Sequence, residues 1–166
     1  IVKDLLAFAR RTKITMESNS IEDIINKSLN LISHDLELKE IQLKKTIEPN
    51  LPKVKCDFNQ IQQVLLNLMY NASEAMLNGG TLTVTAKRAA GAKALLEIII
   101  SDTGCGIDEQ DMENIFEPFF TTKEEQKGVG LGLAVVYGII TKHNGSIVVE
   151  SEVGKGSTFT GRLPCT

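Results

Sequence analysis

The stretch DFNQIQQVLLNLMYNASEAMLNGG (residues 57–80) contains the clearest helix signal in the chain. Asp57 is suited to the N-cap, and Gln60 three residues later completes a capping box. The helix is expected to run to about Asn78, where a Gly-Gly pair stops it. Apolar side chains at helical spacing form one face: Ile61, Val64, Leu65, Leu68, Ala72 and Ala75. The segment therefore predicts an amphipathic helix that packs against a core.

The other side of this helix carries a stripe of polar residues, namely Gln63, Asn67, Asn71 and Glu74. A solvated face is the usual explanation of such a stripe. Asn, however, is a poor residue inside a helix, because its amide competes for backbone hydrogen bonds. Two Asn one turn apart therefore favour a functional use of the amides. Their carbonyl oxygens suit a hard cation such as Mg²⁺.

Working outward, apolar periodicity predicts the remaining elements. Helices are expected at 21–38, 108–115 and 131–143, and strands at 41–48, 53–56, 81–88, 93–101, 146–152 and 157–163. The strand at 93–101 contains a run that is apolar on both faces, which is typical of a central strand. Paired strands with interspersed helices predict an α/β fold with a mixed sheet and its helices on one face, a two-layer α/β sandwich. A doubly wound sheet fits less well.

Composition narrows the class of protein. The chain has 166 residues, is 42% hydrophobic and carries a net charge of −3, so no nucleic-acid partner is expected. Its three cysteines lack zinc-site spacing and indicate reduced thiols in a cytoplasmic domain. No apolar run approaches the ~20 residues of a membrane span. Because the chain begins with Ile1 rather than Met, we expect a fragment, and a membrane segment is possible only upstream of it.

A glycine-bearing segment follows the predicted central strand. Asp102 at the end of that strand can accept a hydrogen bond from a ligand amino group, and Gly104 and Gly106 allow a sharp turn and the approach of a planar ring. The alternative is a strand-to-helix turn in which the Asp is only a local cap.

Three alternating glycines, Gly128, Gly130 and Gly132, open a predicted helix. Free backbone N–H groups at such a position can bind phosphates. The polar segment 116–127 before them is typical of a mobile lid. The alternative is an ordinary flexible loop, and neither a P-loop nor a dinucleotide fingerprint is present in the chain.

Five motifs, in their order along the chain, resemble those of sensor histidine kinases. They correspond to the N box, first glycine box, F box, second glycine box and last glycine box in NLMYNASEA (67–75), DTGCG (102–106), FEPFFTTK (116–123), GVGLGL (128–133) and GKGSTF (154–159). The resemblance covers residues 17–163. It implies the Bergerat ATP-binding fold that gyrase, mismatch-repair and heat-shock-chaperone ATPases share.

The resemblance also implies a site for ATP and Mg²⁺. Asn71 would be the metal ligand, Asn67 would lie beside it near the phosphates, and Asp102 would bind the adenine amino group. Gly104 and Gly106 would make room for the ring. The other implied nucleotide-binding positions are Ile107, Phe116, Thr122, Lys123, Gly128, Gly130, Leu131, Gly132, Leu133 and Thr158.

Within that set, Phe116 would pack under the lid together with Phe119 and Phe120. Thr122 and Lys123 would approach the phosphates. Thr158 would lie near the adenine end of the nucleotide.

One position bears on the reaction. In the hydrolysing relatives a Glu one turn before the Mg²⁺-binding Asn acts as general base on water, and here that position is Asn67. A neutral amide cannot take a proton from water at neutral pH. Phosphoryl transfer from ATP to a protein His is therefore expected, with Asn67 and Lys123 as catalytic residues. The alternatives are a hydrolysing ATPase or a serine/threonine kinase of the same superfamily, and a regulatory module that only binds nucleotide.

The resemblance divides the chain in two. Residues 1–15, which begin IVKDLLAFAR, resemble the C-terminal end of a dimerisation and phosphoacceptor hairpin, and 16–166 the catalytic ATP-binding domain. The acceptor His is expected upstream. The implied partners are a response regulator receiver domain and a second copy bound through upstream helices, and the chain by itself is expected to be monomeric. His34 is expected on a helix surface, and His143 in a last helical turn, where a positive charge is favoured.

Overall fold

The computed structural model describes residues 14–91, 94–117 and 132–165. The helices of this part are α2 (Ile21–Leu38), α3 (Phe58–Ala75) and α4 (Gly132–Lys142), and a single 3₁₀ turn, η1, spans Glu109–Asp111. Its strands are β1 (Glu17–Asn19), β2 (Ile41–Ile47), β3 (Val54–Cys56), β4 (Gly80–Arg88), β5 (Leu95–Asp102), β6 (Ser146–Glu152) and β7 (Gly156–Pro164). The predicted helix at 108–115 is wrong, because only η1 forms there.

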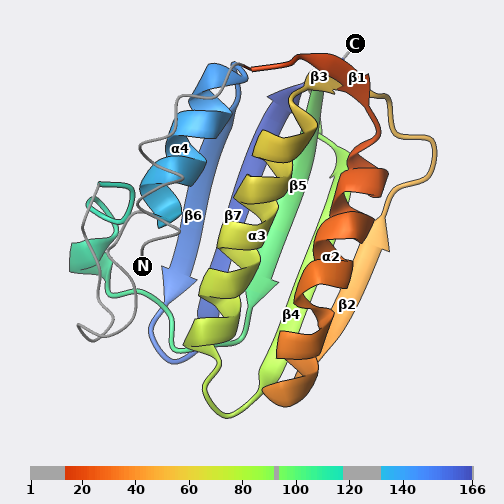
Figure 1. The fold of residues 1–166 in the computed structure, drawn as a ribbon. Coiled ribbons are helices and arrows are strands. Elements are labelled where there is room, and N and C mark those ends of the chain that lie inside the picture. Colours follow the sequence, from red (N-terminus) through yellow and green to blue (C-terminus); the bar gives the residue numbers. More distant parts are fainter. Residues whose placement is uncertain (1–13, 92–93, 118–131, 166) are drawn as a thin grey trace.

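The elements form two layers (Figure 1). Five strands pair in the order β2-β4-β5-β7-β6, with β2 and β4 parallel and the other neighbours antiparallel. The helices α2, α3 and α4 cover one face of this sheet, with α3 in the middle. Strands β1 and β3 form a separate antiparallel pair. The predicted mixed sheet in a two-layer α/β sandwich is confirmed.

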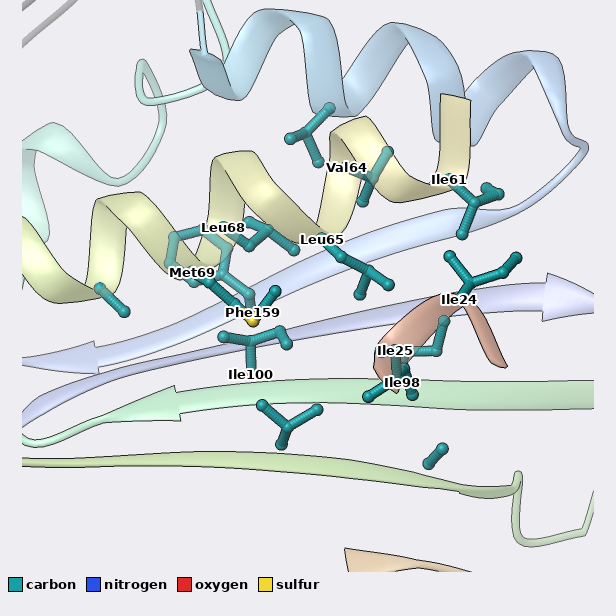
Figure 2. Close-up of a cluster of buried hydrophobic side chains, with 14 of the residues drawn as sticks. Ile24, Ile25, Ile61, Val64, Leu65, Leu68, Met69, Ile98, Ile100 and Phe159 are labelled. Carbon is teal, nitrogen blue, oxygen red and sulfur yellow. The ribbon is translucent and has the colours of Figure 1, made fainter. Parts of the chain in front are cut away.

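The core lies between α3 and the two central strands (Figure 2). Leu65 and Met69 on α3 are almost fully buried and face Ile100 of β5 and Phe159 of β7. Burial of each such side chain contributes on the order of 1.5–3 kcal/mol. This packing fixes how α3 is rotated, so its polar stripe with Asn67 and Asn71 faces away from the apolar core.

The N-terminal end of α3 is capped by Asp57, as predicted. Its Oδ1 accepts the Gln60 N–H at 3.0 Å, and its Oδ2 accepts the Thr15 N–H at 2.8 Å. The capping box is nevertheless incomplete, because the Asp57 N–H donates to Nε2 of His143 at 3.1 Å. The Gln60 Oε1 that would have accepted it is buried with no hydrogen-bond partner among the described residues.

His143 is therefore a core residue rather than a charged helix end. It follows the last residue of α4, is only 4% exposed, and has its Nδ1 at 2.8 Å from the Ile139 carbonyl oxygen. Because Nε2 accepts the Asp57 N–H, the proton of the neutral ring lies on Nδ1. The expectation of a positive charge here is wrong. His34, in contrast, lies exposed on α2 as predicted.

The C-terminal end of α3 also differs from its prediction. The helix ends at Ala75, before Asn78, and Gly80 opens β4 instead of following the helix directly. Met76 is 1% exposed, so the chain turns here to bury that side chain in the core. The carbonyl oxygen of Ala75 accepts the N–H of Cys105, which lies after β5. A distant segment therefore sets the end of this helix.

Two further observations concern the described residues as a whole. No helix in 14–91, 94–117 or 132–165 has the length and apolar character that crossing a bilayer requires. The three cysteines, Cys56, Cys105 and Cys165, carry free thiols, as their wide spacing predicts.

The substitution His143→Phe is expected to lower the free energy of unfolding by about 1–3 kcal/mol, because it keeps a ring but leaves the buried Asp57 N–H without an acceptor. Urea denaturation of the purified chain measures this change. The matched control is His34→Ala on the exposed face of α2, which is expected to stay within about 0.5 kcal/mol of wild type. Equal stability of His143→Phe and wild type would show that the hydrogen bond from the Asp57 N–H to His143 does not stabilise the fold.

Candidate functional site

Asp102 is a buried carboxylate at the end of β5, with an exposure of only 6%. Its Oδ1 accepts the backbone N–H of Gly104 at 2.8 Å and that of Ser157 at 3.3 Å. Burial raises the pKa of the Asp102 carboxyl, and these two backbone hydrogen bonds oppose the rise without cancelling it. No hydrogen bond to Oδ2 is found within the described ranges. One oxygen of the pair is thus held by the fold and the other remains available to a ligand.

The loop after Asp102 is fixed from two sides by its backbone. The Cys105 N–H donates to the Ala75 carbonyl oxygen at 3.1 Å, and the Cys105 carbonyl oxygen accepts the Gly154 N–H at 2.8 Å. The first bond ties the loop to the last residue of α3, and the second ties it to the turn between β6 and β7. Asp102 is therefore placed on a rigid support between these elements.

The glycines of this loop are required by backbone contacts. A Cβ on Gly104 would lie 2.5 Å from the Ala75 carbonyl oxygen, which no real side chain tolerates. Gly106 has φ +78°, and a Cβ there would collide with the Glu152 carbonyl oxygen. The resemblance explained these glycines by the room that a planar ring needs. The structure adds that they make room for neighbouring backbone, and the room for a ring stays a prediction.

The two Asn of α3 have different surroundings. Asn67 is held at both ends of its amide, because its Nδ2 donates to the carbonyl oxygen of Gly132 at 3.1 Å and its Oδ1 accepts from Gln63 Nε2 at 2.6 Å. Asn71 is half-buried, and its amide has no hydrogen bond to any residue that the structure describes. Asn71 lies one turn before Ala75, so it is the free amide nearest to the Asp102 loop along α3.

Phe116 joins α4 to strand β7 of the sheet. Its ring centroid is 5.7 Å from that of Tyr137 on α4 and 6.4 Å from that of Phe159 on β7, the second contact being edge-to-face. Such aromatic pairs contribute on the order of 0.5–1.5 kcal/mol beyond their buried area. Phe116 therefore links the segment that follows η1 to both α4 and β7.

The structure places Ser157, and not Thr158, beside Asp102. In the β5–β7 register Asp102 is opposite Ser157 and Ser101 is opposite Thr158. Because side chains alternate between the two faces of a strand, Thr158 lies on the other face, where its hydroxyl is 2.8 Å from that of Ser101. The residue beside Asp102 is thus Ser157, and the place of Thr158 near the adenine end stays a prediction. The alternation of β7, counted from buried Phe159, was the signal that could have identified Ser157.

The remaining positions fall into two groups. Ile107 and Leu133 are partly buried and pack against the core, and Gly132 begins α4 with open space where a Cβ would be. Seven other positions named by the resemblance lie outside the described residues: Phe119, Phe120, Thr122, Lys123, Gly128, Gly130 and Leu131.

The site thus combines the buried Asp102 carboxylate, at the end of β5, with the Asn71 amide on α3, which has no hydrogen bond to the described residues. Together with the following comparisons, it defines an ATP-binding catalytic domain of the Bergerat type. Residues 56–166 match the family described as histidine kinase-, DNA gyrase B-, and HSP90-like ATPase. The chain belongs to this family. Within it, the similarity is to the catalytic domains of histidine kinases.

The similar proteins are named as kinases of this kind. Sensor histidine kinase ZraS of Escherichia coli (strain K12) is 43% identical over 99% of this chain, and sporulation kinase E of Bacillus subtilis (strain 168) is 36% identical over the same share. These matches span 34% and 22% of the two relatives. The chain thus spans about a third or less of the length of these relatives.

Solved structures agree with the fold. The catalytic domain of histidine kinase ThkA has a TM-score of 0.78 at 29% identity, with 93% of this chain and 97% of that one covered. Full-length ShkA in complex with AMPPNP has a TM-score of 0.85 at 27% identity, with 99% of this chain and 35% of that one covered. The expected Bergerat fold is confirmed.

Asp102→Asn is expected to raise the free energy of unfolding at pH 7. The carboxyl has a raised pKa in the folded state, so its charged form is less favourable there than in the unfolded chain. An Asn oxygen keeps both backbone hydrogen bonds and carries no charge. The gain should be present above the folded-state pKa and vanish once the pH falls to about 3, below the ordinary Asp pKa. Urea denaturation at both pH values measures it, and a less stable variant at pH 7 would contradict the analysis.

Proposed function

We propose that residues 16–166 bind Mg²⁺ and ATP and transfer the γ-phosphoryl group to an acceptor His on dimerisation helices. The observation that carries this proposal is the buried Asp102 carboxylate, which has one oxygen tied to backbone donors and one available beside α3. The similarity to sensor histidine kinases supports it, as does the similarity to ShkA, which was solved with the ATP analogue AMPPNP.

Asp102 would select the base. Its Oδ2 would accept a hydrogen bond from the adenine amino group, while Gly104 and Gly106 hold the loop in place through the contacts described above. Ser157, whose N–H bonds to the carboxylate, and Ile107, whose N–H bonds to Ser151, would border the ring. A charged acceptor with a low exposure forms a stronger hydrogen bond than one in open water.

Asn71 would bind the metal through its carbonyl oxygen. Mg²⁺ usually takes one or two protein oxygens and keeps phosphate and water oxygens for the rest. It would neutralise charge on the phosphates during transfer. The backbone of the glycine motif at 128–133, with Thr122 and Lys123, would bind the phosphates by resemblance. Asn67 would hold the first residue of α4 through Gly132, which leads into that motif.

Phosphoryl transfer is favoured over hydrolysis by Asn67. Its amide cannot take a proton from water, and it is held in place by one donated and one accepted hydrogen bond within the protein. A hydrolysing ATPase is the second candidate and would need another base. A purely regulatory nucleotide-binding module remains the alternative if binding occurs without transfer.

The acceptor would lie outside residues 16–166. The chain has two His, and His143 uses both ring nitrogens within the core. Residues 1–15 would be the end of the dimerisation hairpin, and full-length protein would form a homodimer through upstream helices. A response regulator receiver domain would take the phosphoryl group from the His. ThkA, solved in complex with response regulator protein TrrA, has a TM-score of 0.80 at 26% identity. Such a domain would act in the cytoplasm, with any membrane segment upstream.

Asp102→Asn is expected to weaken ATP binding about 10- to 100-fold, the loss for one hydrogen bond to a charged group. Its amide would turn a donor toward the adenine amino group, and the variant should be more stable than wild type at pH 7, so a loss of affinity would not reflect unfolding. Calorimetric titration of the purified chain with ATP and Mg²⁺ measures the affinity, with Asp23→Asn on the exposed face of α2 as control. Unchanged affinity in Asp102→Asn would refute the assignment, and no ATP binding by wild type would refute the proposed function.

Asn71→Ala is expected to remove the dependence of ATP affinity on Mg²⁺ while leaving metal-free binding in place, because the metal would lose its protein oxygen. Titrations with Mg²⁺ and with a chelator separate Mg²⁺-dependent from metal-free ATP binding. Asn30→Ala, exposed on α2, is the control. In the full-length protein the same variant should fail to transfer label from γ-labelled ATP to His. A Mg²⁺ dependence equal to wild type would place the metal elsewhere.

A further inference from the structure

The hydroxyl of Ser151 on β6 connects three segments around the Asp102 loop. Its Oγ accepts the Ile107 N–H at 2.7 Å, donates to the Gly156 carbonyl oxygen at 2.9 Å, and lies 2.8 Å from the Oγ of Ser157. Ser151 itself is opposite Ser157 in the β6–β7 register, so the two side chains share one face of the sheet.

Counting protons fixes the direction of each of these bonds. A Ser hydroxyl has one proton and two acceptor lone pairs. The carbonyl of Gly156 cannot donate, so that contact uses the Ser151 proton. The Ile107 N–H occupies one lone pair of Ser151. The contact with Ser157 must then use the proton of Ser157, which donates into the second lone pair. Toward any other group, the Ser157 hydroxyl can therefore only accept.

Ser157 lies directly beside the proposed base-binding carboxylate. Its backbone N–H donates to Asp102 Oδ1 at 3.3 Å, the two residues are opposite each other in the β5–β7 register, and each is 6% exposed. The carboxylate is likewise an acceptor. The two side chains thus present acceptors only, which suits a ligand edge that carries N–H donors.

We propose that Ser151 is a positioning residue for base specificity, which holds the Ser157 hydroxyl as an acceptor and so favours a 6-aminopurine over a 6-oxopurine. This inference rests on the proposed binding of ATP at Asp102. Adenine offers an amino group with two donors at its 6-position. A 6-oxopurine places a carbonyl oxygen there, which acceptors that face the 6-position repel. Its N1–H donor lies at the neighbouring ring position, so the proposal places both acceptors at the 6-position. Without the Ser151 hydroxyl, the Ser157 hydroxyl proton loses its acceptor, and the hydroxyl can rotate and donate to that carbonyl oxygen.

The experiment compares ATP with inosine triphosphate, which replaces the 6-amino group by an oxo group, in calorimetric titrations of the purified chain with Mg²⁺. In Ser151→Ala the preference for ATP over inosine triphosphate is expected to fall about fivefold, the effect of one neutral hydrogen bond. Ser151→Thr, which keeps the hydroxyl, should retain the wild-type preference. The control Ser146→Ala, at an exposed position of the same strand, should also retain it.

A double-mutant cycle separates positioning from simple support of the loop. If Ser151 acts through Ser157, Ser157→Ala alone lowers the preference, and adding Ser151→Ala to it changes the preference no further. A Ser151→Ala variant that weakens both nucleotides equally overturns the inference, since loss of loop support does not distinguish them. If Ser151→Ala does not fold, an unchanged preference in Ser157→Ala overturns it instead. Wild type that binds neither nucleotide refutes the proposed function, whereas ATP binding with an unchanged preference in the variants refutes only the role of Ser151.

Discussion

The close approach of two backbones at Gly104 is the constraint on which the site depends. There the loop after β5 touches the last turn of α3 without any side chain between them, and the Cys105 N–H bonds to the Ala75 carbonyl oxygen. A Cβ at Gly104 would force these segments apart, and with them the Asp102 carboxylate and the Asn71 amide. The distance between the proposed base and metal ligands is therefore set by a glycine that bonds to Asp102 through its backbone N–H and approaches Ala75 because it has no side chain.

Much of the fold follows from local periodicity, and its departures come from distant contacts. The spacing of apolar residues predicted α2 and β6 with the bounds that the structure has, because each has a simple buried face. The end of α3 could not be predicted, because the carbonyl oxygen of its last residue accepts a hydrogen bond from Cys105, which lies after β5. The partner of the Asp57 N–H could not be predicted either, because His143 lies 86 residues away in sequence.

In the site, too, some features follow from local sequence and others depend on distant contacts. Asp102, Gly104 and Gly106 stand together in one motif, so sequence alone predicts them as a unit, although the reason for the glycines lies in contacts with Ala75 and Glu152. The motif did not indicate that Ser157 rather than Thr158 lies beside Asp102, because the face of a strand residue depends on its register. With a period of two, an error of a single residue moves a side chain to the opposite face. Motif position alone does not carry that information, whereas the buried Phe159 in the same strand does.

Paired groups of one chemical type recur around Asp102, and in each pair one member serves the fold. One Asp102 oxygen accepts two backbone N–H groups, which limits the cost of burying the charge, while the other has no hydrogen bond to the residues that the structure describes. Asn67 is tied to α4, whereas the Asn71 amide has no such bond within the same residues. Ser151 is saturated, which leaves Ser157 with acceptor capacity. A polar side chain can bind a ligand in a fixed orientation only if neighbouring groups hold it in place. A rigid binding site in a small domain therefore needs a second polar group beside each ligand-binding one.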